Sequence, residues 1–311
     1  MAIMRALRLD SAQKLRVVQV NIPKPKFNEV LIEVHIASIL NVDRLFSVPD
    51  SPLGYEASGL VVGSGGGERA DSLLHKRVVR LAELGVPGAW ADYIVAPTED
   101  CVVLPASVSY ADGATMTNAL TLGIAMHLIR PRTSVVLSVP LSSLGRLASI
   151  WLSLAGIYCI RVVHKQEYVD QLRRETNEPV LLSSSADFSQ QLHSLCRQHN
   201  VTAAMEMAGG VVGDTVFSAL LSDCVYIQMG NQDNFSTPVS SDPRKHVEWL
   251  ILLSWLRSHP TEAEAVVTEV LSVLSTLIAN DPIHVFPLYP ISSLFLFLTV
   301  KMRFLPPFQP Q

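Results

Sequence analysis

The sequence predicts an α/β protein in which a doubly wound parallel sheet follows a β-rich, barrel-like domain. Short β-branched runs such as LRVVQV, EVLIEVHIAS and KRVVRL, separated by Pro, Gly, Asp and Asn, occupy residues 1–110. Residues 111–280 alternate strand-like and helical patterns instead. Within them, TSVVLSV at 133–139 precedes a helical pattern at 144–154 and a second strand, IYCIRVV, at 157–163. That order predicts parallel strands joined by a crossover helix.

The other elements follow in chain order. We expect helices over 109–129 (with Ser109 as N-cap), 166–176, 188–198, 213–221 and 262–278, and strands over 179–185, 201–210 and 224–230. The apolar segment 247–257 is expected at the edge of the sheet or beside it. The tail, 281–311, returns to short strand-like segments and is expected to complete the first domain. GSGGG at 63–67 predicts a flexible turn with no helix behind it, which disfavours a phosphate-binding loop.

Composition excludes several classes of function. The chain has 311 residues and a formal net charge of −4, without a basic cluster, so nucleic acid is not an expected partner. The four cysteines form no C-x-x-C pair, which is typical of a reducing compartment. Apolar residues make up 49% of the chain, yet no run approaches the roughly 20 residues needed to span a bilayer. The excess is either core or surface covered by a partner.

The turn between the first strand and helix of the parallel sheet is the first candidate site. A dinucleotide-binding unit would carry G-x-G-x-x-G there, whereas this chain has Pro140-Leu141-Ser142-Ser143-Leu144-Gly145. Gly145 keeps the third glycine, and the hydroxyls of Ser142 and Ser143 can donate to a phosphate at a helix N-terminus. Pro140 removes one N–H. The alternative is a strand-to-helix turn without a ligand.

The end of the second strand is the next candidate. Enzymes that use NAD place an acidic residue there to bind the ribose hydroxyls. This chain has His164 and Lys165 instead, which favours a 2′-phosphate and hence NADPH. Arg161, inside the strand, is a further candidate for the same phosphate. The alternative is an ordinary solvated strand end.

Several motifs, in order, resemble those of one enzyme superfamily. They are PLGYEASGLVVGSGGG, HKRVVR, GAWADYIVAPTEDCVVLP, NALTLGIAMHLI, AMEMAGG and VYIQMG. Together they resemble the medium-chain dehydrogenase/reductase superfamily, and within it the zinc-free quinone oxidoreductases and mitochondrial 2-enoyl thioester reductases. The resemblance implies a GroES-like β-barrel domain (1–110, completed by 281–311) and a Rossmann domain (111–280).

The resemblance also implies site residues. Asn118 and Thr121 match helix positions that contact the nicotinamide ribose and the substrate in the family. Tyr55 stands at the family's histidine position and is a candidate proton donor, although a packed tyrosine is the alternative. Gly209 and Gly230 are expected to line the cofactor cleft. The family's zinc-ligand positions fall near Leu40, Tyr55 and Thr117, none of which is a usual zinc ligand, so no metal is expected.

Two functions remain open from the sequence. The first is an NADPH-dependent, zinc-independent reductase of an activated alkene, either a 2-enoyl thioester or a quinone. The second is a catalytically degenerate member of the family that serves as a structural subunit of a larger, mitochondrial assembly; the eroded glycine turn and the apolar composition favour it. In either case we expect a homodimer or a subunit of a larger complex. The expected location is mitochondrial by resemblance and otherwise cytoplasmic, and the basic N-terminus contains no evident targeting peptide.

Overall fold

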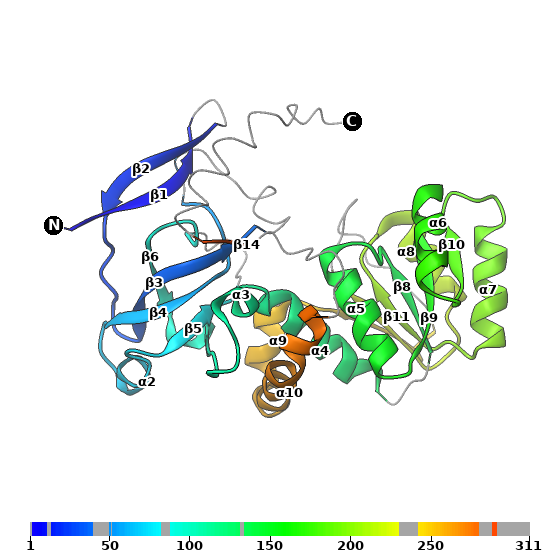
Figure 1. Cartoon of the computed structure of the whole chain (residues 1–311). Coiled ribbons are helices and arrows are strands. Elements are labelled where there is room, and N and C mark those ends of the chain that lie inside the picture. Colours follow the sequence, from blue (N-terminus) through cyan, green and yellow to red (C-terminus); the bar gives the residue numbers. More distant parts are fainter. Residues whose placement is uncertain are drawn as a thin grey trace. The chain divides into compact units, whose positions relative to one another are not determined.

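A computed structural model describes residues 2–10, 14–39, 50, 52–81, 88–130, 134–229, 242–279 and 288–290. Leu40 and Gly230 lie outside the described residues. The chain divides into two compact units (Figure 1). One comprises Met1–Thr117 with Phe286–Gln311, and the other comprises Asn118–Val285.

The first unit is built from antiparallel strands. β1 (Ile3–Leu9) and β2 (Leu15–Asn21) pair as a hairpin. In the described part of the chain, a second sheet has the order β14-β3-β4-β5-β7, with β6 also paired to β3. Its strands are β3 (Glu29–Ser38), β4 (Ala57–Ser64), β5 (Arg77–Arg80), β6 (Tyr93–Pro97), β7 (Cys101–Val103) and β14 (Leu288–Pro290). Alternate residues of β3, such as Val30 and Ile32, face one shared core with residues of β4 and β5.

The glycine-rich segment before β5 corrects one expectation. A short helix, α2 (Glu68–Ser72), follows Gly67 directly, although the sequence predicts none. A Cβ on Gly65 would lie only 1.8 Å from the carbonyl oxygen of Lys26, and one on Gly67 only 2.3 Å from Oδ1 of Asn28. These glycines therefore allow close packing against the 26–28 loop. A helix of this length also gives no basis for an anion site.

The second unit contains the parallel sheet. In the described part, six strands run in the order β10-β9-β8-β11-β12-β13, and every neighbouring pair is parallel. The strands are β8 (Ser134–Ser138), β9 (Tyr158–Val163), β10 (Val180–Leu182), β11 (Ala203–Glu206), β12 (Cys224–Gln228) and β13 (Lys245–Trp249). β13 is the outermost strand described, so residues 247–249 lie at the sheet edge as expected, whereas residues 252–257 of the same apolar segment form a helix that follows the strand. The doubly wound α/β class predicted from sequence is confirmed as well.

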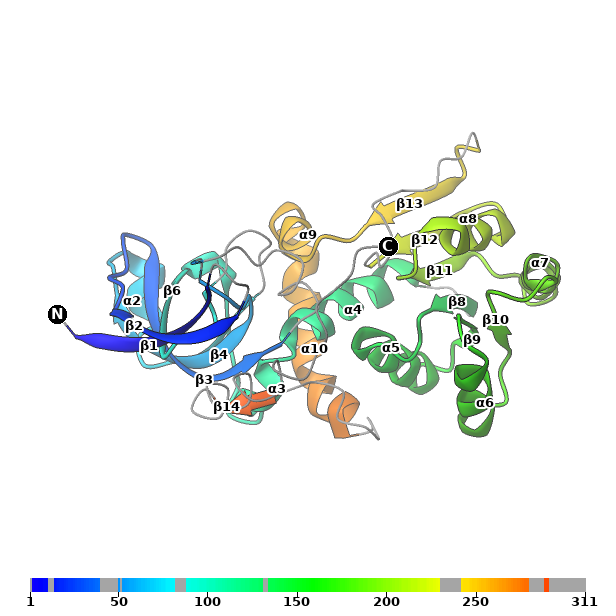
Figure 2. The same ribbon diagram turned by 90° about the horizontal axis from the view of Figure 1, so that it is seen from above.

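Helices cover both faces of this sheet. α5 (Ser143–Leu154) and α6 (Gln166–Glu175) lie on one face, and α7 (Phe188–Gln198) and α8 (Gly210–Ala219) lie on the other (Figure 2). On the α7–α8 face, Phe188, Leu192 and Phe217 pack in one cluster with strand residues such as Val136 and Tyr226. Strands buried on both faces carry continuous apolar runs, which explains TSVVLSV and IYCIRVV.

Four further helices among the described residues belong to the two units. The predicted helix over 109–129 is interrupted, giving α3 (Tyr110–Gly113) and α4 (Met116–Ile129). Ser109 and Asp112 form the capping box that opens α3, and the hydroxyl of Thr115 donates to the carbonyl of Asp112 between the two helices. α9 (Leu252–Ser258) and α10 (Pro260–Ala279) follow β13. α10 packs closely on α4 at Gly123, where a Cβ atom would lie only 2.4 Å from the side chain of Val270. The absence of a side chain at Gly123 permits this close approach.

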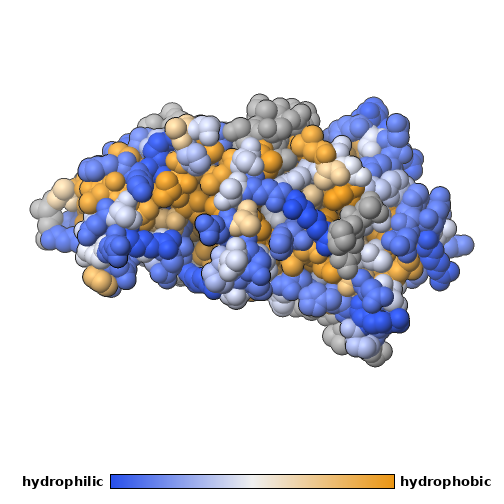
Figure 3. Space-filling model, turned by 90° about the horizontal axis from the view of Figure 1, so that it is seen from below, coloured by the Kyte–Doolittle hydropathy of each residue, from blue (hydrophilic) through white to orange (hydrophobic). Residues whose placement is uncertain are grey.

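The surface carries apolar side chains in several separate places. Figure 3 shows hydrophobic residues scattered among hydrophilic ones on one face of the molecule. The large apolar side chains exposed among the described residues include Ile3, Phe27, Leu154, Val211, Trp249 and Ile251. Among the helices described, none combines the length and the hydropathy that a membrane span requires.

Candidate functional site

The carboxyl end of the parallel sheet contains the point where the strand order reverses. β8 lies at the centre, with β9 and β10 on one side and β11, β12 and β13 on the other. The connections leaving β8 and β11 lead to helices on opposite faces, α5 and α8 (Figure 2). In doubly wound proteins, ligands bind in a crevice at such a point. The second unit thus places the Pro140–Gly145 turn, the end of β9 and Gly209 at one edge.

The turn after β8 is held closed by a hydroxyl of its own. Ser142 is the N-cap of α5, and its Oγ accepts a hydrogen bond from the backbone N–H of Gly145 at 3.0 Å. The same hydroxyl donates to the carbonyl oxygen of Val139, also at 3.0 Å. Ser143 is the first residue of the helix and is half-buried. Ser142 therefore caps the helix and has no spare proton to donate to a phosphate in this arrangement.

Two further residues define the shape of the turn. Gly145 admits no side chain, because a Cβ there would lie 2.2 Å from the carbonyl oxygen of Val139. Val139 itself adopts φ = 50°, a left-handed conformation that β-branched residues strongly disfavour. The sequence indicates the need for Gly145 but not the strain at Val139. That strain falls one position before Pro140, which stands where the dinucleotide-binding pattern would have its first glycine.

The end of β9 brings a histidine, a lysine and a tyrosine ring together. His164 and Lys165 are both exposed. The His164 ring meets the ring of Tyr168 edge-on at 5.2 Å, and Nζ of Lys165 lies 5.4 Å from the centre of that ring. Lys165 also pairs with Glu167 at 3.5 Å, a solvated contact worth little in free energy. The arrangement leaves Lys165 able to exchange this partner for a phosphate.

Arg161 does not belong to this group, contrary to expectation. Its side chain is buried and its Nη1 lies 2.5 Å from Oε2 of Glu178, while Oε1 of Glu178 accepts from the backbone of Cys159. A buried guanidinium needs such a partner. The two residues are 17 positions apart, a pairing that strand composition alone does not reveal.

A row of buried polar residues ends the central strands. Ser138 of β8, Glu206 of β11 and Gln228 of β12 occupy neighbouring positions, and all three side chains are almost fully buried. We call this set the polar rung. Oγ of Ser138 donates to Oε1 of Glu206 at 3.0 Å. None of the three stands out in the sequence, because their burial in register is visible only in the folded sheet.

Glu206 organises the loop that leads into α8. Its carboxylate accepts hydrogen bonds from the backbone N–H of Ala208 at 2.7 Å and of Gly209 at 3.0 and 3.1 Å. Gly209 precedes α8 with φ = 72°, and a Cβ on Gly210 would meet nothing within 4 Å. Space is therefore open above the first turn of α8. Tyr226 lies beside Glu206, and burial, reinforced by that negative charge, raises the pKa of the Tyr226 hydroxyl.

Asn118 and Thr121 share one face of α4, three positions apart. Thr121 is buried and Asn118 half-buried. Tyr55 belongs to the first unit and is 2% exposed, which fits the packed alternative better than a free acid. Its carbonyl oxygen accepts from Nη1 of Arg80 at 2.9 Å. The adjacent Glu56, fully buried, accepts from the backbone N–H of Thr117 at 2.6 Å and so anchors the start of α4.

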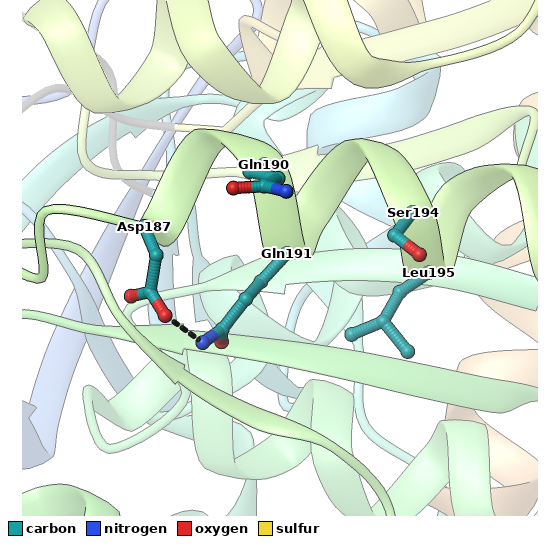
Figure 4. Close-up of a pocket in the computed structure, with 5 residues that line it drawn as sticks. All are labelled: Asp187, Gln190, Gln191, Ser194 and Leu195. Carbon is teal, nitrogen blue, oxygen red and sulfur yellow. Dashed lines mark hydrogen bonds between the residues drawn. The ribbon is translucent and has the colours of Figure 1, made fainter.

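Metal ligands and cavities add little to this site. Among the described residues, no group of three or more His, Cys, Asp or Glu side chains is arranged to hold a metal ion. The pocket in Figure 4 is a surface hollow of about 470 Å³ along α7, lined by Asp187, Gln190, Gln191, Ser194 and Leu195. Hydrogen bonds from Ser185 and Gln191 lower the pKa of Asp187 there. None of its residues belongs to the candidate site.

Comparison with known proteins places this architecture. No protein-family model matches the chain, and no curated protein matches its sequence. Among solved structures, a putative NADPH:quinone reductase from Mesorhizobium loti shares 26% identity over 89% of both chains, with a TM-score of 0.76. The Escherichia coli quinone oxidoreductase, solved with NADPH, shares 19% over 89% of both, with a TM-score of 0.69. The CurK enoyl reductase shares 15% over 88% of both, also at 0.69.

These likenesses extend along nearly the whole chain rather than over the parallel sheet alone. The two-part organisation, with an antiparallel unit ahead of a doubly wound one, is therefore common to all of them. The chain has the fold of the quinone and enoyl reductases, and its resemblance to the zinc-free branch of the medium-chain dehydrogenase/reductase superfamily is confirmed.

Proposed function

We propose that the protein is an NADPH-dependent reductase of an activated alkene, of the 2-enoyl thioester or quinone type, that works without zinc. The observation that carries the proposal is the cationic end of β9. His164 and Lys165 stand exposed where an enzyme that prefers NAD would present a carboxylate. The structural neighbours whose names specify NADPH support the same assignment.

The residues of the crevice fit a dinucleotide. Gly145 lets the start of α5 lie against the turn, so the helix N-terminus faces the sheet edge where a pyrophosphate would sit. Open space above Gly210 provides room on the β11 side. Lys165, with Tyr168 beneath it, would hold the 2′-phosphate. The hydroxyl of Ser142 caps the helix, so we assign phosphate contact to the backbone N–H groups at the start of α5, where Ser143 is the first helical residue.

The chemistry divides between the cofactor and the chain. NADPH supplies a hydride when bound, and the protein must bind the cofactor and the substrate, orient them and polarise the substrate. We assign substrate and ribose contacts to Asn118 and Thr121. Tyr55 remains the candidate proton donor, although its burial argues for a positioning role beside Glu56. Gly209 and Gly230 would border the cleft. A homodimer and a mitochondrial location belong to the same proposal and rest on the family resemblance.

The experiment is a calorimetric titration of the purified protein with NADPH and, separately, NADH. We expect a micromolar dissociation constant for NADPH and a dissociation constant at least tenfold higher for NADH. Lys165→Ala should weaken the binding of NADPH and leave the binding of NADH unchanged. Lys76→Ala, at an exposed lysine of the first unit, should change the affinity for neither cofactor. A screen of enoyl thioesters and quinones follows. Equal affinity of the wild type for both cofactors would contradict the assignment of Lys165.

A structural-subunit function is the second candidate, and Val139 is the observation that favours it. A β-branched residue at φ = 50° costs of order 1 kcal/mol, and it directly precedes a turn in which Pro140 and Ser142 replace two glycines of the dinucleotide-binding pattern. A chain that no longer binds a dinucleotide would tolerate this. Absence of NADPH binding at millimolar concentration, together with co-purification in a defined complex, would establish this second function and refute the first.

A further inference from the structure

The most unusual group in the second unit is the side-chain amide of Gln228. This residue is 1% exposed, and neither Nε2 nor Oε1 has a hydrogen-bond partner among the residues that the structure describes. A buried amide left in this state loses its hydrogen bonds to water without replacing them, so each such group in a native protein calls for an explanation. Its neighbours in the polar rung differ, because Ser138 and Glu206 are both hydrogen-bonded.

The position of Gln228 is equally informative. It is the last residue of β12, in register with Glu206 of β11, at the carboxyl edge where a ligand of this fold binds. His164 and Lys165 at the end of β9 would fix the adenosine half of the cofactor. β9, β8, β11 and β12 are consecutive in the sheet, so three strand spacings, about 14 Å, separate the two ends. An extended dinucleotide spans such a distance and would bring its nicotinamide half to β12.

The chemistry of the unpaired amide selects the group it takes. Gln228 offers one acceptor and an NH₂ donor side by side, and a second primary carboxamide satisfies both at once. The nicotinamide ring carries such a carboxamide. We propose that Gln228 is a specificity-determining residue that binds the carboxamide of the nicotinamide ring; this inference rests on the proposed function.

The test compares three ligands by calorimetry: NADPH, its 3-acetylpyridine analogue, and 2′-phospho-ADP-ribose, which keeps the phosphates but lacks the ring. Gln228→Leu preserves approximate volume and removes both polar atoms. Gln190→Leu, at an exposed amide of α7, is the matched control. The thermal midpoint of each ligand-free variant gives a readout independent of activity.

We expect Gln228→Leu to weaken NADPH about tenfold or more, because a site built to hydrogen-bond a group is then left without its partner. The acetylpyridine analogue, which has no NH₂ group, should bind the wild-type protein more weakly than NADPH does. Its affinity should also fall less than that of NADPH in the Gln228→Leu variant. 2′-Phospho-ADP-ribose should bind both proteins equally. The ligand-free Gln228→Leu variant should melt at a higher temperature than wild type, since it buries no unpaired amide.

Other outcomes separate the two proposals. Unchanged NADPH affinity in Gln228→Leu, or equal weakening of NADPH and 2′-phospho-ADP-ribose, would overturn the assignment of Gln228 and leave the reductase proposal standing. A lower melting temperature of the free variant would show that the amide has a structural partner, such as a bound water, and would also overturn the assignment. Failure of wild type to bind any of the three ligands would overturn both proposals.

Discussion

The hydroxyl of Ser138 and the carboxylate of Glu206 form a buried hydrogen bond of 3.0 Å between adjacent parallel strands. The same hydroxyl accepts from the backbone N–H of Met207 at 2.6 Å, and the carboxylate accepts from Ala208 and Gly209. One carboxylate thus holds the ends of two strands and the entrance to α8. The reversal of strand order, which creates the crevice, is stabilised by side chains rather than by the ladder alone.

Removal of this carboxylate should be costly. Glu206→Ala leaves three donors without an acceptor, and we expect a loss of about 3 kcal/mol in the free energy of unfolding. Ser138→Ala should cost about 1 kcal/mol, and the double variant less than the sum of the two, because they share one hydrogen bond. Urea denaturation followed by far-UV circular dichroism measures all three. Glu248→Gln, at the sheet edge, is the control and should change stability by less than about 0.5 kcal/mol. Strict additivity would contradict the coupling.

Relief of strain at Val139 should stabilise the protein. Asn tolerates φ near +50° far better than Val, so Val139→Asn should gain about 0.5–1 kcal/mol. The chain offers a reciprocal control at Asn200, which also adopts φ = 50° and is exposed. Asn200→Val should lose a similar amount. The same denaturation measurement gives both values, and a loss of stability in Val139→Asn would show that its side-chain packing outweighs the strain.

The cysteines should be inert in the folded protein. All four are free and buried, and burial raises the pKa of Cys101, Cys159 and Cys196 to about 12. A thiol that keeps its proton is a poor nucleophile. At pH 8 we expect a chromogenic disulfide reagent to titrate no thiol in the native protein and four after unfolding in urea. Rapid native reaction of any thiol would show that its surroundings open.

The same shifts determine how stability depends on alkaline pH. Unfolded cysteines lose their proton near pH 9, whereas the folded ones hold it to about pH 12. Their contribution to stability is therefore fully present below pH 9 and is lost as the pH rises from 9 to 12. Cys159→Ala should make the decline of unfolding free energy between pH 9 and 11 shallower. A slope equal to that of wild type would contradict the assignment to Cys159.

The edge strand β13 makes the predicted homodimer testable. Antiparallel pairing of two copies centred on Val247 would place His246 of each opposite Glu248 of the other. His246→Glu should then weaken the dimer, and the swapped double variant His246→Glu/Glu248→His should restore it. Sedimentation equilibrium measures the dissociation constant. A wild-type dimer unaffected by His246→Glu would have its interface elsewhere.

Local chemistry made much of the fold predictable. Ser109 caps α3 as predicted, and Gly156 follows the end of α5 at φ = 67°, both through contacts within a few positions. Ser142, for which the sequence predicts a phosphate contact, caps α5 instead. Predictions that depended on distant partners were weaker. Arg161 pairs with Glu178 inside the protein, and α2 follows a glycine segment shaped by the 26–28 loop.

The candidate site was predictable only in outline. Strand–helix–strand order located the turn and the end of β9, because parallel strands bring those ends to one edge. The polar rung was missed: a single Ser, Glu or Gln in an apolar run carries no pattern of its own, and its meaning comes from register with the next strand. Tyr168 was missed for a similar reason, since its contact with Lys165 depends on where α6 begins.

The packing of Gly145 limits how the sequence of this turn can evolve. A side chain at this position would collide with the backbone of its own turn, whether or not a nucleotide is ever bound. Selection for a folded protein alone would therefore retain this glycine. The other two glycines of the pattern are not required by this contact, so they can be replaced once no nucleotide is bound. A glycine kept at the third position alone therefore indicates a conserved fold and does not by itself indicate nucleotide binding. A protein of this fold that serves only as a structural subunit would still need it.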